Sequence, residues 1–176
     1  FSNEIDMTPD AKALPPGTLV HVAGDDRVLG TGYFNSKSLI GVRLLDAEKD
    51  ATIGKAFFGV RLARALALRE ALYDKPYYLL VHAEGDGLPG LTIDRFDDAC
   101  VVQVTTAGME ALTEPMLEAL DEVLSPRAVV LRNDAPSRAL EGLENYVRAG
   151  RGEIPSRIAI EENGARYFGD LKGGQK

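Results

Sequence analysis

The stretch VHAEGDGLPGLTIDRF, residues 81–96, places acidic side chains, a histidine and glycines close together. His82 and Glu84 lie two residues apart, so on an extended strand they point to the same side. Two such ligands are too few for a metal site, and no second His/Cys pair stands at zinc spacing. Glu84 and Asp86 leave open a carboxylate pair for hydrolysis. The turn residues Gly85-Asp86-Gly87 favour a structural loop between two strands.

Two other motifs carry groups that are reactive or bind ligands in other proteins. Cys100 sits in the apolar segment ACVVQV without a nearby histidine, which indicates a buried, unreactive thiol. The segment GTGYFN, residues 30–35, contains Gly-x-Gly but no following helix, so we predict no dinucleotide site. Its Tyr33 and Asn35, followed by Lys37, can stack on RNA bases and contact the backbone. Packing of the aromatic rings in the core is the competing interpretation.

Two groups of arginines could meet phosphates. Arg61, Arg64 and Arg69 share one sector of an expected helix, for which a solvated helix face is the favoured interpretation. A second polar group follows an expected buried strand, where side chains are commonly displayed towards a site. It comprises Arg132, Asn133, Asp134 and Arg138, with capping of the loop by Asn133 and Asp134 as the alternative.

Charge and composition restrict the class of protein. The chain of 176 residues is 45% hydrophobic and 27% charged, which is typical of a globular protein, and its net charge of −7 disfavours a general nucleic-acid binder. Residues 127–176 nevertheless hold 9 basic and 7 acidic side chains. One cysteine excludes an internal disulfide and fits a reducing compartment, so we expect a cytoplasmic protein. No apolar run is long enough for a membrane span.

Periodicity predicts an α+β fold in two parts. Strands at 18–23, 28–34 and 39–45 predict a small β-barrel-like module over residues 1–46, and the polar segment 46–52 is the expected boundary. A second part, residues 52–176, mixes helices with strands. Its helices are expected from Thr52 to about residue 73, from Thr113 through 124, and at 135–143. Its strands are expected at 77–82, 91–95, 100–105 and 128–134, followed by a hairpin at 157–171 with Asn163-Gly164 in the turn.

Several phrases in order resemble the cytosine-C5 methyltransferases of large-subunit ribosomal RNA that carry an N-terminal PUA domain. The matching pieces are FSNEID, PGTLVHV, LGTGYFNSKSLIGVRLL, LVHAEGDGLPGLTIDRF, VVQVTTAGME, LRNDAPSRALEGL and ENGARYFGDLKGGQK. In that family a PUA domain precedes a central α+β domain and a Rossmann-like domain that binds S-adenosylmethionine. The family pattern starts before Phe1 and continues past Lys176. The resemblance therefore implies the N-terminal part of such an enzyme, with an incomplete PUA module.

The resemblance implies a division of roles. RNA binding falls to the PUA module, around Tyr33, Asn35, Lys37 and Arg43. The central domain would supply one wall of the substrate cleft, with Glu84, Asp86, Arg132, Asn133, Asp134, Arg138 and Gln175 as candidates. The S-adenosylmethionine site and the catalytic cysteine belong to the later domain, so the chain alone is expected to be inactive, with no catalytic residue and no metal.

The resemblance also suggests ribosomal RNA as the partner, no membrane contact and a homodimer. A stand-alone, non-catalytic RNA-binding or adaptor module is the alternative function. A small-molecule hydrolase that uses Glu84 and Asp86 is a third hypothesis.

Overall fold

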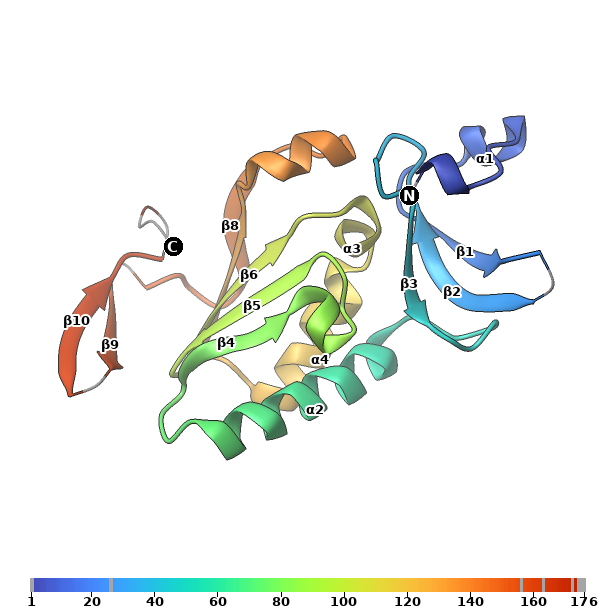
Figure 1. The fold of residues 1–176 in the computed structure, drawn as a ribbon. Helices are drawn as coiled ribbons and strands as arrows, with labels where there is room; N and C mark the ends of the chain where they lie inside the picture. Colours follow the sequence, from blue (N-terminus) through green and yellow to red (C-terminus); the bar gives the residue numbers. More distant parts are fainter. Residues whose placement is uncertain (1, 26, 156, 163, 172, 174–176) are drawn as a thin grey trace.

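The computed structural model describes residues 2–25, 27–155, 157–162, 164–171 and 173. It confirms the mixed α+β class and divides the strands into a small sheet, a five-stranded sheet and a separate hairpin (Figure 1). None of the helices within the described ranges is both long and apolar enough to cross a membrane.

The small sheet lies at one end of the molecule (Figure 1). It contains β1 (Thr18–Ala23), β2 (Val28–Phe34) and β3 (Val42–Asp46), all antiparallel, after the short helices η1 (Ser2–Glu4) and α1 (Pro9–Ala13). Over the described residues this sheet is open rather than closed into the expected barrel. β3 begins at Val42 rather than at the expected residue 39. The Asn35 side chain accepts a hydrogen bond from the Lys37 amide, which holds the chain between β2 and β3 in a turn.

The larger sheet has the strand order β4-β5-β6-β7-β8, and only β6 and β7 run parallel. Its strands are β4 (Tyr77–His82), β5 (Leu91–Phe96), β6 (Ala99–Val104), β7 (Ala128–Asn133) and β8 (Tyr146–Arg151). The helices α2 (Lys55–Leu72), α3 (Ala107–Ala111) and α4 (Thr113–Leu124) complete this part. Figure 1 shows α2 and α4 side by side across one face of the sheet.

The main core lies between those helices and the sheet. Phe58 and Leu62 of α2 and Leu120 of α4 are fully buried against strand residues such as Ile93 and Val102. The opposite face carries a smaller apolar cluster, in which Val101 and Val130 pack with Ile158 of β9 (Ile158–Glu162). β9 pairs with β10 (Ala165–Gly169) in the hairpin at the other end of Figure 1.

Several expected boundaries are corrected by the structure. The residue that precedes α2 is Gly54, so Thr52 is not its N-cap. Residues 136–141 form a 3-10 helix, η3 (Pro136–Glu141), and β8 and α1 had no prediction. The hairpin is confirmed, with Gly164 at a φ of 79°, which a left-handed turn requires. Asn163 of the same turn lies outside the described residues.

Candidate nucleic-acid interface

A buried carboxylate joins the small module to the rest of the chain. Glu141, the last residue of η3, is 6% exposed. Its Oε2 accepts hydrogen bonds from Asn35 Nδ2 at 2.8 Å and from the Ala107 amide at 3.3 Å. Its Oε1 accepts one from Ser38 Oγ at 2.6 Å. We call this group of four residues the seam, since it connects the β2–β3 loop with η3 and the start of α3.

Tyr33 adds a second contact between the two parts. Its ring is 2% exposed and lies so close to Gly108 that a Cβ there would come within 2.0 Å of it. The Tyr33 hydroxyl donates to the Pro89 carbonyl at 3.0 Å and pairs with Thr106 Oγ1 at 2.9 Å. Burial raises the pKa of Tyr33 far above its ordinary value, so the hydroxyl stays protonated. A ring in this position cannot stack on a base unless the two parts separate.

Arg43 connects the seam to the acidic loop after β4. Its Nη1 lies 3.3 Å from Glu84 Oε1, and its Nη2 lies 3.9 Å from Glu141 Oε1. Glu84 itself is 64% exposed, whereas the Arg43 side chain is 19% exposed. Arg43 therefore has a carboxylate on each side and presents little charge to an RNA strand.

Of the four residues predicted to bind RNA, Lys37 is the exposed one. Asn35 is 2% exposed and holds the seam, as described above. Beside Lys37, the same loop exposes Leu39 by 77%. RNA binding by the four residues stays a prediction, and the structure places Lys37 where a ligand can reach it without a rearrangement.

A second polar cluster lies where β6 and β7 end. Arg138 is 1% exposed and donates to Glu110 Oε2 at 2.9 Å, to the Glu144 carbonyl and to the Val104 carbonyl. Asn133 is also 1% exposed: its Oδ1 accepts from the Val104 amide at 2.8 Å. Both side chains bind backbone groups of neighbouring elements, which fixes the loop that carries η3.

The same cluster includes an aromatic hydroxyl that the sequence did not single out. Tyr146 donates from its hydroxyl to Glu110 Oε1 at 2.7 Å and accepts from Asn133 Nδ2 at 2.7 Å. Burial is the largest cause that raises the pKa of Tyr146, followed by its hydrogen bond to Glu110. Glu110 thus neutralises Arg138 and orders Tyr146, so this cluster is internally satisfied.

The remaining cleft candidates differ in exposure. Arg132 Nε lies 3.3 Å from Asp134 Oδ2, and their side chains are 15% and 40% exposed. The cleft role of these two residues stays a prediction. Gln175 lies outside the described residues.

Asp86 is held within the fold. In η2 (Ala83–Asp86), its two carboxylate oxygens accept from Arg69 Nη1 and Nη2, both at 2.8 Å. The His82 amide donates to the same carboxylate, and the Arg69 and Asp86 side chains are 12% and 10% exposed. A carboxylate engaged in this way has no free oxygen for acid/base work with Glu84, which weighs against the hydrolase hypothesis.

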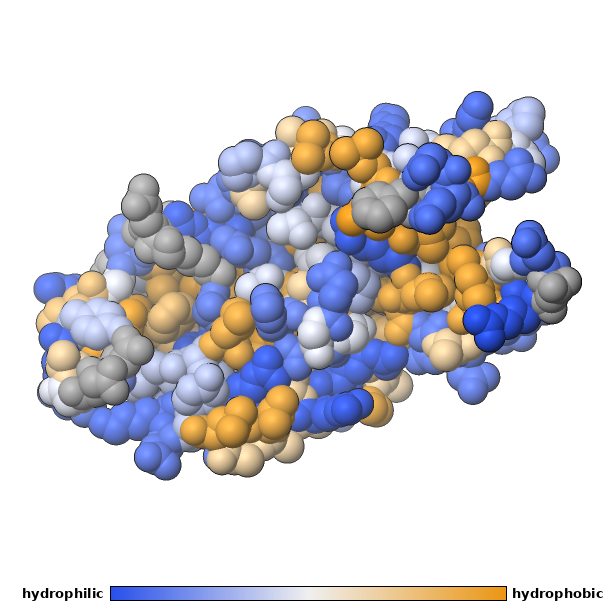
Figure 2. Space-filling view, in the orientation of Figure 1, coloured by the Kyte–Doolittle hydropathy of each residue, from blue (hydrophilic) through white to orange (hydrophobic). Residues whose placement is uncertain are grey.

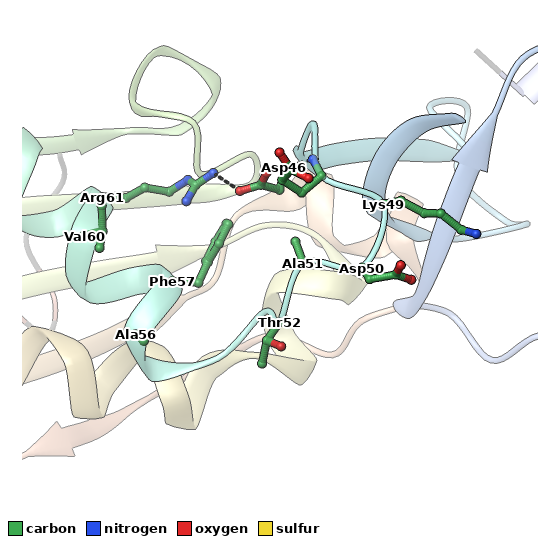
Figure 3. Close-up of a pocket in the computed structure, with 10 residues that line it drawn as sticks. Asp46, Lys49, Asp50, Ala51, Thr52, Ala56, Phe57, Val60 and Arg61 are labelled. Atoms are coloured by element: carbon green, nitrogen blue, oxygen red, sulfur yellow. Dashed lines mark hydrogen bonds and ion pairs between the residues drawn. The ribbon is translucent and has the colours of Figure 1, made fainter. Parts of the chain in front are cut away.

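A hollow of about 580 Å³ lies at the joint between β3 and α2. Figure 3 shows Asp46 and Arg61 pointing toward one another at its edge, with Arg61 Nη2 3.0 Å from Asp46 Oδ2. The Arg61 guanidinium lies over the Phe57 ring, 3.7 Å from its centroid. The hydrogen bond with Arg61 also helps to lower the pKa of Asp46, after a backbone amide.

Cys100 is fully buried in β6, as expected. Burial raises the pKa of its thiol to about 12, so the thiolate that a nucleophile requires does not form near neutral pH. Across the described ranges, no group of three or more histidine, cysteine, aspartate or glutamate side chains is placed to hold a metal ion.

Residues 1–47 match the family model of the PUA-like domain. These residues contain β1, β2, β3 and the loop of the seam. The small module is a PUA-like domain. Within the PUA-like domain, the buried face of β2 and the β2–β3 loop contact the rest of the chain through Tyr33 and the seam.

Curated relatives extend the similarity along the whole chain. The Ribosomal RNA large subunit methyltransferase I of Shewanella amazonensis is 40% identical over 94% of this chain. The protein of the same name from Aliivibrio fischeri strain ES114 is 38% identical over 100% of this chain. The chain covers 43% and 45% of these two relatives, which is less than half of their length.

Solved structures share the fold of this chain. A Streptococcus mutans protein described as a candidate SAM-dependent methyltransferase aligns over 91% of the chain, with a TM-score of 0.76 and 22% identity. SMU.776, a candidate methyltransferase solved with SAH, aligns over 92% with a TM-score of 0.75 and 20% identity. The chain covers 42% and 41% of those structures, respectively.

Proposed function

We propose that this chain is the RNA-engaging part of an S-adenosylmethionine-dependent methyltransferase of large-subunit ribosomal RNA, acting on cytosine C5. The observation that carries the proposal is the similarity to proteins named Ribosomal RNA large subunit methyltransferase I along 94% to 100% of the chain. The PUA-like domain supports an RNA substrate. The cytosine-C5 specificity rests on the resemblance of the sequence motifs.

The proposal assigns binding and positioning to this chain. The PUA-like domain binds RNA through exposed groups such as Lys37. The polar edge with Glu84, Arg132 and Asp134 faces the substrate cleft. The seam and the buried Arg138 cluster keep that edge and the PUA-like domain in a constant arrangement.

The chemical step is assigned to groups outside these residues. S-adenosylmethionine would supply the methyl group, but the Gly-x-Gly segment of this chain does not form a cofactor-binding loop. Gly30-Thr31-Gly32 lies inside β2, and a loop rather than a helix follows that strand. Methylation at C5 by a cysteine nucleophile needs an accessible thiolate. Cys100 is buried and its pKa is raised to about 12, so it does not serve this purpose.

Two measurements test the proposal. Methyl transfer from radiolabelled S-adenosylmethionine to large-subunit ribosomal RNA is measured for this chain and for the product of the whole open reading frame that encodes it, and 5-methylcytosine is mapped by bisulfite sequencing. We expect no transfer by the chain, and 5-methylcytosine with the product of the whole reading frame. Transfer by the 176-residue chain alone would overturn the division of roles. A different methylated base would overturn the C5 assignment.

A further inference from the structure

A second hollow, of about 630 Å³, lies between α2 and the η2 loop. Its α2 side is formed by Val60, Arg61, Arg64, Ala65 and Leu68, and its other side by residues 85–87. We call it the α2 groove. Val60 and Arg61 also line the hollow at the joint (Figure 3), so the two hollows share these two residues.

The helix that forms one side of the α2 groove is basic, although the protein as a whole is acidic. α2 carries Lys55, Arg61, Arg64 and Arg69 against the single acid Glu70, while the whole chain has a net charge of −7. Arg64 is exposed, and among residues that the structure describes no carboxylate pairs with it. This asymmetry favours an anionic ligand.

The other charges around the groove leave donors available. In the part of the chain that the structure describes, Arg61 uses only Nη2 in its hydrogen bonds, to Leu45 and Asp46, so Nε and Nη1 can donate to a ligand. Asp86, an acid that lines the groove, is neutralised by the bidentate contact with Arg69. A phosphate in the groove would therefore meet guanidinium groups without an opposing free carboxylate.

The floor of the groove is apolar. Val60 is 69% exposed and Leu68 is 52% exposed, and Leu72 continues the same stripe at 67%. Figure 2 shows hydrophobic side chains gathered at the edge of the molecule over the C-terminal half of α2. Gly85 and Gly87 on the opposite side carry no side chain, so a sugar-phosphate backbone can approach closely there.

We propose that the α2 groove binds a single-stranded segment of RNA, an inference that rests on the proposed function and extends it to a second RNA contact. Phosphates contact Arg64 and the free donors of Arg61, and a base packs on Leu68. Arg64, which has no carboxylate partner among the described residues, and the free donors of Arg61 favour an anionic backbone, and the exposed Leu68 beside them favours the bases of a single strand. We therefore assign the groove to RNA rather than to a protein helix.

The test uses this chain and a fluorescein-labelled, unstructured RNA of about 12 nucleotides, with anisotropy titrations at several salt concentrations. Arg64→Ala is the variant, because Arg64 is exposed on a helix where alanine is well tolerated. Arg64→Lys keeps the charge. Arg127→Ala is the matched control, since it also removes one exposed positive charge. Arg127 directly precedes β7, and its side chain is 62% exposed although it forms an ion pair with Asp98.

We expect Arg64→Ala to weaken binding about 3- to 10-fold and to lower the salt slope by about 0.7, as for one lost phosphate contact on a single strand. Arg64→Lys and Arg127→Ala should stay within about twofold of the unchanged chain. Equal losses for Arg64→Ala and Arg127→Ala, or no loss for Arg64→Ala, would overturn the groove. If the unchanged chain binds neither this RNA nor ribosomal RNA, the proposed RNA-binding function fails as well.

Discussion

Replacing Glu141 by alanine should loosen the PUA-like domain from the rest of the chain. The substitution leaves the Ser38 hydroxyl and the Ala107 amide without their acceptor. Asn35 Nδ2 loses one of its two bonds but keeps the one to the Glu141 carbonyl, which alanine retains. At about 1–3 kcal/mol for each of the two buried groups left unpaired, we expect a loss of about 2–6 kcal/mol in unfolding free energy.

Glutamine at the same position should cost less. With its amide nitrogen turned to Ser38, whose hydroxyl can accept, the remaining oxygen still serves Asn35 and Ala107. We expect a loss of about 1–2 kcal/mol for Glu141→Gln. Glu144→Ala is the matched control, because Glu144 lies in the same loop and is exposed, and it should change stability by less than about 0.5 kcal/mol.

Urea unfolding followed by far-UV circular dichroism gives these free energies, and hydrogen exchange locates the change. Glu141→Ala should accelerate amide exchange in β2 and β3, because the seam holds the β2–β3 loop against η3 and α3, while β5 and β6 lie in the other sheet and keep their protection. Equal urea midpoints for Glu141→Ala and Glu144→Ala would refute the reasoning. So would a uniform increase of exchange across both sheets.

Three further predictions concern single substitutions, the first of them with a control variant. Asp86→Asn should lower the unfolding free energy by about 2–4 kcal/mol, since it leaves the largely buried Arg69 without its counter-charge. Glu84→Gln, at an exposed side chain, should cost less than about 0.5 kcal/mol, and equal urea midpoints for the two variants would contradict this. Gly108→Ala should cost at least about 1–3 kcal/mol in the same assay, because its Cβ would overlap the Tyr33 ring; a wild-type midpoint would show that the ring can move aside. Because burial raises the pKa of Cys100 from 9.0 to about 12, its thiol ionises first in the unfolded chain. Its contribution to stability is complete below pH 9.0 and is lost as the pH rises towards 12, by up to about 1.4 kcal/mol per pH unit. Cys100→Ala should flatten the fall in urea midpoint between pH 9 and pH 10, and parallel curves would contradict it.

The sequence predicted those elements whose local signals agree with their final packing. The apolar rhythm of residues 113–124, with a proline in the first turn, predicts the start of α4 at Thr113, where the structure has it. β8 escaped prediction because its sequence YVRAGR is polar and lies at the edge of the sheet, where burial imposes no strict alternation.

The seam could not be predicted for a different reason. Asn35 and Glu141 are separated by 106 positions, and nothing in the local sequence of either residue indicates the other. By composition, Tyr33 and Asn35 beside Lys37 resemble an RNA-binding loop. In the structure, however, Tyr33 is buried because Gly108 approaches its ring closely. Four structural polar residues also had no signal in the sequence, because polar side chains with buried partners have the same local sequence pattern as solvated ones. These residues are Glu141, Ser38, Glu110 and Tyr146.

The seam has a consequence for RNA binding that the two proposed contacts share. If the PUA-like domain and the α2 groove each hold part of one RNA, the second contact gains most from the first while their separation stays matched to the span of the RNA. Loosening the seam with Glu141→Ala should therefore weaken binding of a long RNA that spans both by roughly tenfold or more. A short RNA confined to the groove should bind as before, because its contacts lie on α2 and η2 and not on the seam. Equal losses for both lengths would indicate general unfolding instead, and equal affinities would mean that the two surfaces act independently.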